Sequence, residues 1–349
     1  MSNFFISTGA VSSAVRASIL TDQKQLVRTQ KEIATGRIAD VGLEIGHRSR
    51  EMVALRQTLT WSQSIVGTNS IVATRLETSQ AGMADIEKIS NAFLEGLLGA
   101  RGTSPGLSQV EAQASSLLTA FLSRLNVEVA GTYVFGGTNS SQPPMASYFS
   151  TSGSAARSSM QQAFQAHFGM PSDDPAVATI GPAAMSAFLD GDFAGEFTDA
   201  AWSSRWSAAS GENVIGRISL TEMQEIGANA NEEPFRQLAK AFVLVGDLGG
   251  KALQQQTRAV ALEKATELVG SALTGLASMR SRVGISQERT SSAGERLSLQ
   301  IDIATRRLAD IEGVDPYASA IELNELMTRL EASYATTARL QRLSLLDYL

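Results

Sequence analysis

The residues that could support chemistry are few and far apart. The two histidines, His47 and His167, are distant in the sequence, so they form neither a metal-binding pair nor a catalytic dyad. Asp173 and Asp174 could bind a hard cation, but Asp174 precedes Pro175, an arrangement typical of a helix N-cap. The chain has no cysteine, which excludes thiolate nucleophiles, thiolate metal ligands and disulfides. The sequence therefore predicts no catalytic site and no metal site.

Two glycine-rich segments resemble phosphate-binding loops only superficially. In residues 246–252 the first glycine is out of register, and Ala252 stands where a hydroxyl would hold magnesium. The segment Phe135, Gly136 and Gly137 lacks the spacing of a dinucleotide fingerprint and predicts a tight turn at a domain junction. We therefore expect no cofactor and no enzymatic activity.

Charge and hydropathy exclude two further classes of partner. The net charge of -6 gives no basic footprint for phosphate backbones, so nucleic acid is not an expected partner. No apolar run approaches the roughly 20 residues needed to cross a bilayer, so we expect no membrane insertion. The first ten residues lack a basic segment ahead of an apolar stretch, which predicts export, if any, without a cleaved signal peptide.

Helical periodicity dominates the N-terminal part of the chain. Apolar residues from Val11 to Ile33 recur on one narrow face and predict an amphipathic helix that ends at Gly36. A second stripe runs from Met52 to Leu97 and predicts a helix of about 45 residues, or about 70 Å. A third helix is expected after a turn at residues 99–106, with Ser108 and Glu111 at capping-box spacing.

The C-terminal part carries the strongest periodic signal. Apolar residues alternate at spacings of three and four from Leu262 to Val283, which is typical of a coiled-coil seam. The seam returns at residues 297–311, and Asp315 followed by Pro316 predicts the start of another helix. A helix at each end of the chain cannot cover its own stripe, so we expect the two ends to pack together.

The predicted fold is mainly α, with a long antiparallel coiled-coil stem made from N- and C-terminal helices and a small mixed α/β domain inserted in the middle. The predicted domains are an N-terminal assembly helix (1–45), the N-terminal part of the stem (46–137), the inserted outer domain (138–233), the C-terminal part of the stem (234–312) and a C-terminal assembly helix (313–349).

The apolar stripe at the N-terminal end is narrow, and the C-terminal end is apolar on almost all sides. Because both lie at chain termini, they favour burial between subunits rather than within one chain. The predicted subunit-interface residues are Val11, Val15, Ile19, Leu26, Ile33, Leu330, Tyr334, Leu340, Leu343 and Leu346. An alternative function of another class stays open: a hydrolase or ligand-binding domain in residues 156–231, where acidic and aromatic residues gather and a deep polar pocket would support it.

Three sequence segments resemble the flagellin superfamily, and within it the hook-filament junction branch, the third hook-associated protein. Residues 30–37 (Gln-Lys-Glu-Ile-Ala-Thr-Gly-Arg) are similar to the helix-to-glycine ending of flagellin-type proteins. Residues 131–139 (Gly-Thr-Tyr-Val-Phe-Gly-Gly-Thr-Asn), followed by Pro143 and Pro144, resemble a segment of the junction branch. Residues 330–334 and 343–349 resemble the superfamily's C-terminal assembly helix.

The resemblance implies a structural component of the bacterial flagellum that joins hook to filament, with flagellin, the bulk filament subunit, as the alternative. It also implies partners: copies of the same chain in a ring or helical tube, the hook-side junction protein, flagellin, and an export chaperone on the C-terminal helix. The implied location is extracellular, at the hook-filament junction, with the inserted domain on the exterior.

Overall fold

The computed structural model describes residues 8–40, 42, 46–100, 104–150, 153–248 and 253–346. The chain forms two compact units, one of residues 1–63 with 298–349 and one of residues 64–297. The predicted fold class is confirmed, because long N- and C-terminal helices pack together and the strands are short and lie between them. In the described residues no helix has the length and apolar character required to cross a membrane.

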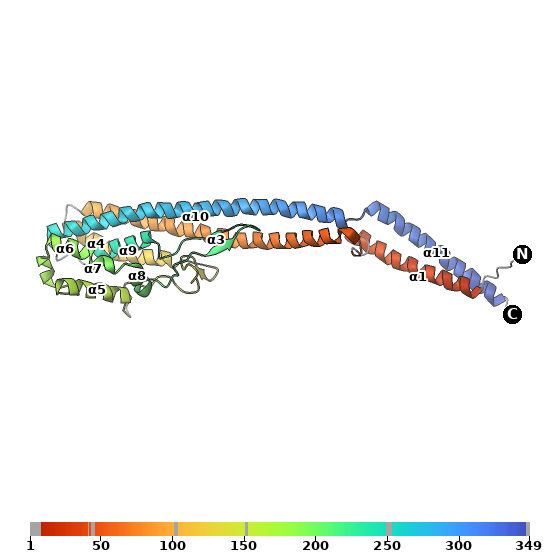
Figure 1. The fold of residues 1–349 in the computed structure, drawn as a ribbon, viewed down its shortest axis with the longest axis horizontal. Helices are drawn as coiled ribbons and strands as arrows, with labels where there is room; N and C mark the ends of the chain where they lie inside the picture. Colours follow the sequence, from red (N-terminus) through yellow and green to blue (C-terminus); the bar gives the residue numbers. More distant parts are fainter. Residues whose placement is uncertain are drawn as a thin grey trace. The chain divides into compact units, whose positions relative to one another are not determined.

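The first unit pairs helices from the two ends of the chain (Figure 1). Helix α1 (Thr8–Thr35) packs antiparallel to α11 (Pro316–Leu346). Gln23 Nε2 donates to Tyr334 Oη at 2.7 Å, and Gln25 Nε2 donates to Glu322 Oε1 at 3.0 Å. The unit also contains the short 3-10 helix η1 (Gly46–Arg48), the beginning of α3 (Ser49–Ala100) and the end of α10 (Gln255–Glu312).

The second unit is built on the antiparallel pair of α3 and α10, the two long helices that run side by side in Figure 1. Gln80 Nε2 donates to Arg280 O at 2.6 Å, and the Arg280 guanidinium pairs with Glu87. The predicted seam is buried along its whole length between Leu262 and Val283. The stem is therefore a coiled coil in which the apolar stripes of α3 and α10 cover each other.

Helices α4 (Ser104–Leu125) and α9 (Glu233–Gly246) pack together and extend this core. The ring of Phe242 lies 4.8 Å from that of Phe93 and 5.8 Å from that of Phe121, centroid to centroid. The expected start of the third helix at Ser108 is wrong, since α4 begins at Ser104. Pro105 lies in the first turn of this helix, where a missing N–H costs no hydrogen bond.

A tight turn follows the hairpin of β1 (Glu128–Val129) and β2 (Thr132–Tyr133), which pair with Val129 opposite Thr132. Phe135 is fully buried, and its ring meets that of Phe235 edge-on at 5.8 Å. The predicted turn residues Gly136 and Gly137 are tightly enclosed: Gly136 O accepts from Ser210 N at 3.1 Å, and Gly137 has φ +61°.

A second hairpin, β3 (Ile215–Arg217) with β4 (Met223–Glu225), lies against the stem. Asn69 Nδ2 donates to Ile218 O at 2.8 Å. Gln224 Nε2 donates to Ser286 O and to Thr290 Oγ1, both at 2.8 Å. The polar residues that interrupt the helical seams therefore hold this hairpin.

Short helices occupy the inserted segment: α5 (Ala155–Phe168), the 3-10 helix η2 (Pro175–Thr179), α6 (Pro182–Asp190), α7 (Asp192–Gly195) and α8 (Asp199–Arg205). As expected for a helix cap, Asp174 Oδ1 accepts from Ala176 N at 2.7 Å. The aromatic residues of this segment form its core, with Trp202 stacked on Trp206 at 5.1 Å.

One buried carboxylate connects the inserted segment to the end of α9. Asp247 accepts from Arg157 Nη2 at 2.7 Å and from Tyr148 Oη at 2.9 Å. Burial and the neighbouring Asp247 raise the pKa of Tyr148 well above its ordinary value, so its hydroxyl stays a donor.

Gly131, within the β1–β2 hairpin, and Gly137, in the turn that follows it, allow a matched test of how tightly the turn is enclosed. Gly131 has φ +78° and open space around the position of a Cβ, so Gly131→Ala carries only the left-handed strain of about 1–2 kcal/mol. At Gly137 a Cβ would also lie 2.6 Å from Glu212 O and against Ser210. We expect Gly137→Ala to lower the free energy of unfolding by about 2–5 kcal/mol in urea titrations followed by circular dichroism. Equal losses for the two variants would show that the turn is not sterically enclosed.

Candidate assembly surface

The seam between α1 and α11 covers part of the predicted interface within one chain. Leu330 is buried, as is Leu326 one turn earlier. Val15, Ile19 and Leu26 are half-buried on the facing side of α1. The antiparallel pair thus covers one face of each terminal helix without any second copy.

Large apolar side chains remain exposed elsewhere on the same two helices. The exposed fractions are 58% for Leu20, 64% for Val27, 83% for Tyr317, 62% for Ile321, 47% for Met327, 51% for Tyr334 and 37% for Ile33. Leu20 and Val27 are seven residues apart, so they share one face of α1, away from the buried Thr29. Groups of exposed apolar side chains are typical of protein interaction sites, and here they lie on more than one side of the two helices. We name these seven residues the outer terminal face.

Sequence reasoning found only two residues of the outer terminal face, Ile33 and Tyr334. It missed Leu20 and Val27 because they lie outside the main stripe, although their spacing of one heptad was a visible signal. The side chains of Val11, Leu340, Leu343 and Leu346 lie outside the part that the structure describes. Their assignment to the interface stays a prediction.

A junction of four chain segments anchors this pair in the first unit. It joins the end of α1, the first turns of α3, the end of α10 and the start of α11. Ile38 N donates to Glu312 O at 2.8 Å, and Arg37 pairs with Gly313 in an antiparallel bridge. Asp315 caps α11 by accepting from Tyr317 N at 2.8 Å, as the sequence predicts.

Buried glutamates accept the hydrogen bonds and ion pairs that hold this junction together. The Glu312 side chain is only 2% exposed, and its Oε1 accepts from Arg56 Nη2 at 2.6 Å and Nε at 3.0 Å. Arg37 Nη1 lies 3.6 Å from Glu312 Oε2. Glu32 accepts from the backbone N–H of Ala39 at 3.0 Å. Because a buried charge is costly unless paired, these bonds fix where each helix ends and the next begins.

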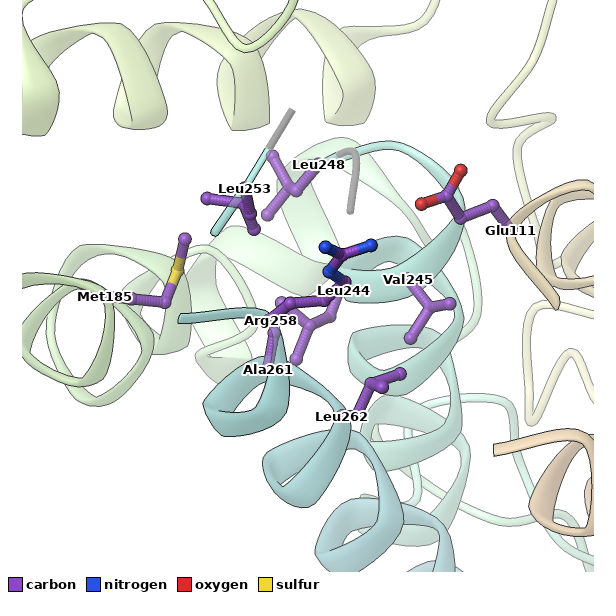
Figure 2. Close-up of a pocket in the computed structure, with 9 residues that line it drawn as sticks. All are labelled: Glu111, Met185, Leu244, Val245, Leu248, Leu253, Arg258, Ala261 and Leu262. Carbon is purple, nitrogen blue, oxygen red and sulfur yellow. The ribbon is translucent and has the colours of Figure 1, made fainter. Parts of the chain in front are cut away.

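The apolar cavity in Figure 2 does not form a catalytic centre. It has a volume of about 20 Å³, enough for about one water, and its walls are mainly aliphatic. Figure 2 shows the Arg258 guanidinium and the Glu111 carboxylate among side chains such as Leu244, Leu253 and Leu262. In the part of the chain that the structure describes, no three His, Asp or Glu residues are grouped to hold a metal ion.

The buried carboxylate of the junction is testable by removal. We expect Glu312→Ala to lower the free energy of unfolding by about 1–3 kcal/mol, because it leaves the arginines without their buried acceptor. Amide hydrogen exchange measured by mass spectrometry should rise in peptides that span Ile38. Glu51→Ala is the control, since Glu51 and Arg48 form a half-exposed pair 3.7 Å apart. An unchanged exchange rate at Ile38 in Glu312→Ala would refute the role of this carboxylate.

Comparison with known proteins connects this architecture to a family. The model of the bacterial flagellin N-terminal helical region matches residues 6–140, and that of the bacterial flagellin C-terminal helical region matches residues 266–349. Together the two regions cover more than half of the chain. A search of curated proteins finds no significant match.

A solved structure has a similar fold. The chain aligns with a protein assigned as a flagellar hook-associated protein of Vibrio parahaemolyticus, with a TM-score of 0.50 and 8% sequence identity. The alignment covers 77% of this chain and 99% of that one. At this identity the likeness concerns the fold alone. The two family matches, which fall on the helices that pair in the structure, show that the chain belongs to the flagellin superfamily, whose members are structural components of the bacterial flagellum.

Proposed function

We propose that the chain is a hook-filament junction protein, which connects hook to filament by helix packing between subunits. The observation that carries this proposal is the outer terminal face, which leaves large apolar side chains uncovered after α1 and α11 have paired. Flagellin-family proteins self-assemble and associate with other flagellar axial proteins, so neighbouring copies in a ring or helical tube are the partners that would cover this face.

Two observations favour the junction role over the bulk filament. The segment of residues 131–139, which resembles the junction branch, forms the enclosed turn around Phe135 and is held by Arg75 Nη2, which donates to Val134 O at 2.7 Å. The similar solved structure is assigned as a flagellar hook-associated protein. Flagellin itself stays the alternative, because both matched family models describe flagellin regions.

The proposal includes a set of contacts and partners. Among the predicted interface residues, Val15, Ile19, Leu26 and Leu330 hold the α1–α11 pair together. The others, Val11, Ile33, Tyr334, Leu340, Leu343 and Leu346, act with the outer terminal face in contacts between subunits. The hook-side junction protein and flagellin are the proposed axial neighbours, and an export chaperone is proposed to bind the C-terminal helix before assembly. Export then proceeds without a cleaved signal peptide, and the inserted domain faces the exterior.

A charge on the outer terminal face should block assembly without unfolding the chain. Leu20 is exposed in the free chain, so Leu20→Asp costs little folding stability, but a buried unpaired carboxylate is unfavourable in an interface. We expect incorporation into flagella to fall at least about tenfold, as measured by immunoblots of sheared flagella. Ser18→Asp places the same charge on an exposed polar position of α1 and should incorporate normally. Normal incorporation of Leu20→Asp would remove this face from the interface.

The junction role is testable by location and abundance. Immunogold labelling of intact cells should mark only the base of each filament, and a deletion strain should make hooks that lack filaments. Labelling along the whole filament would instead identify the chain as flagellin and contradict the junction assignment.

A further inference from the structure

A polar cavity lies in the segment for which sequence analysis leaves a ligand-binding alternative open. Its volume is about 540 Å³, within the range of about 300–1,000 Å³ typical of small-molecule sites. It lies wholly within the unit of residues 64–297. Its walls come from α8, the loop between α8 and β3, the loop after β4 and the first turn of α9, and include Asp199, Ser203, Asn213, Asn229 and Arg236.

Hydrogen bonds fix the orientation of the amide groups in these walls. Asn229 Nδ2 donates to Asn213 Oδ1 at 2.8 Å, and Asn213 Nδ2 donates to Glu225 Oε2 at 3.2 Å. Asn231 Oδ1 accepts from Trp202 Nε1 at 3.1 Å. The cavity is therefore preformed, and a ligand would not have to pay for ordering these side chains.

Some polar atoms of the walls keep bonding capacity. Arg236 pairs with Asp199 and, through Nη2, with Glu233 Oε2 at 2.7 Å. Its Nε is buried and has no hydrogen-bond partner among the residues that the structure describes. This Nε is shielded from the cavity, whereas Nη1 and Nη2 each carry a second N–H beside the one that meets a carboxylate. The Asp199 carboxylate and Asn213 Oδ1 each have further lone pairs for donors.

The charges of the cavity select against an anion. The Arg236 guanidinium already pairs with two carboxylates, and a third acidic side chain, Glu232, pairs with Arg282 at 3.0 Å, so the acidic groups outnumber the arginines. An anionic ligand would therefore meet a net negative environment. Neutral hydroxyl groups can accept from the second N–H of Arg236 Nη1 or Nη2 and donate to Asp199 or to Asn213 Oδ1, and each hydroxyl can do both.

We propose that this cavity binds a short neutral saccharide, whose hydroxyl groups bond to Arg236, Asp199 and Asn213. The ordered amides orient the sugar, and the mixed lining of carboxylate, amide and guanidinium groups gives selectivity for a polyhydroxylated neutral ligand. This binding is independent of assembly and of the junction role, since the cavity involves neither α1 nor α11.

A glycan array tests the proposal directly. The labelled full-length chain is applied to immobilised neutral and sialylated oligosaccharides. We expect retention on a subset of the neutral glycans and none on the sialylated ones. The best-retained glycan, as a free saccharide, is then titrated while tryptophan fluorescence is recorded, because Trp202 lines the cavity.

Two tryptophan substitutions one residue apart give a matched control. Ser203 is an exposed residue in the cavity wall, so Ser203→Trp should fill the cavity and weaken binding at least about tenfold. Ser204 is also exposed on α8 but does not line the cavity, and Ser204→Trp should bind like the parent chain. Circular dichroism checks that both variants fold.

Three outcomes would overturn the proposal. No retention of any neutral glycan would show a cavity that holds only water. Equal retention of sialylated glycans would contradict the charge argument. Unchanged binding by Ser203→Trp would place any glycan contact outside this cavity.

Discussion

The structure depends on one constraint: each long helix carries an apolar stripe that it cannot cover alone. The chain meets this constraint by antiparallel pairing of segments from its opposite ends, α3 with α10 and α1 with α11 (Figure 1). Along α3 and α10 the seam is buried, and α4, α9 and their phenylalanines close the core, while side chains such as Trp61 and Ile71 stay exposed. Helices α1 and α11 cover each other along their seam, while side chains such as Leu20 and Tyr317 stay exposed. The stem therefore has an extended buried core, whereas few side chains of the terminal pair are buried.

Polar residues determine where these pairs end. The four-way junction places Glu312 and Glu32 among apolar side chains such as Met52 and Ile311, and arginines and backbone N–H groups satisfy the carboxylates. In the stem, Asn69, Ser286 and Thr290 stand in place of apolar seam residues. Their hydrogen bonds to Ile218 and Gln224 hold the β3–β4 hairpin. A purely apolar seam could slide along its heptads, whereas hydrogen bonds at defined positions fix the register.

The sequence predicts the long elements well and the local exceptions poorly. The stripe from Leu262 to Val283, the glycine ending of α1 and the cap at Asp315 follow from periodicity and capping chemistry, and each appears in the structure. The predicted start of α4 is wrong, because a proline such as Pro105 is compatible both with a turn and with the first turn of a helix. Five of the seven residues of the outer terminal face were not predicted, because exposure depends on which helix packs against which side, and periodicity does not reveal that. The cavity around Arg236 gathers residues from segments distant in the sequence, so no local motif could signal it.

The central claim is that neighbouring copies cover the outer terminal face in the flagellum, and the lack of native cysteine permits a direct measurement. A single cysteine introduced by Leu20→Cys can be reacted with a maleimide in the free chain and in intact flagella. The account predicts rapid labelling of the free chain and at least about tenfold slower labelling in flagella, because the side chain becomes buried between subunits. Equal labelling rates in the two states would contradict it.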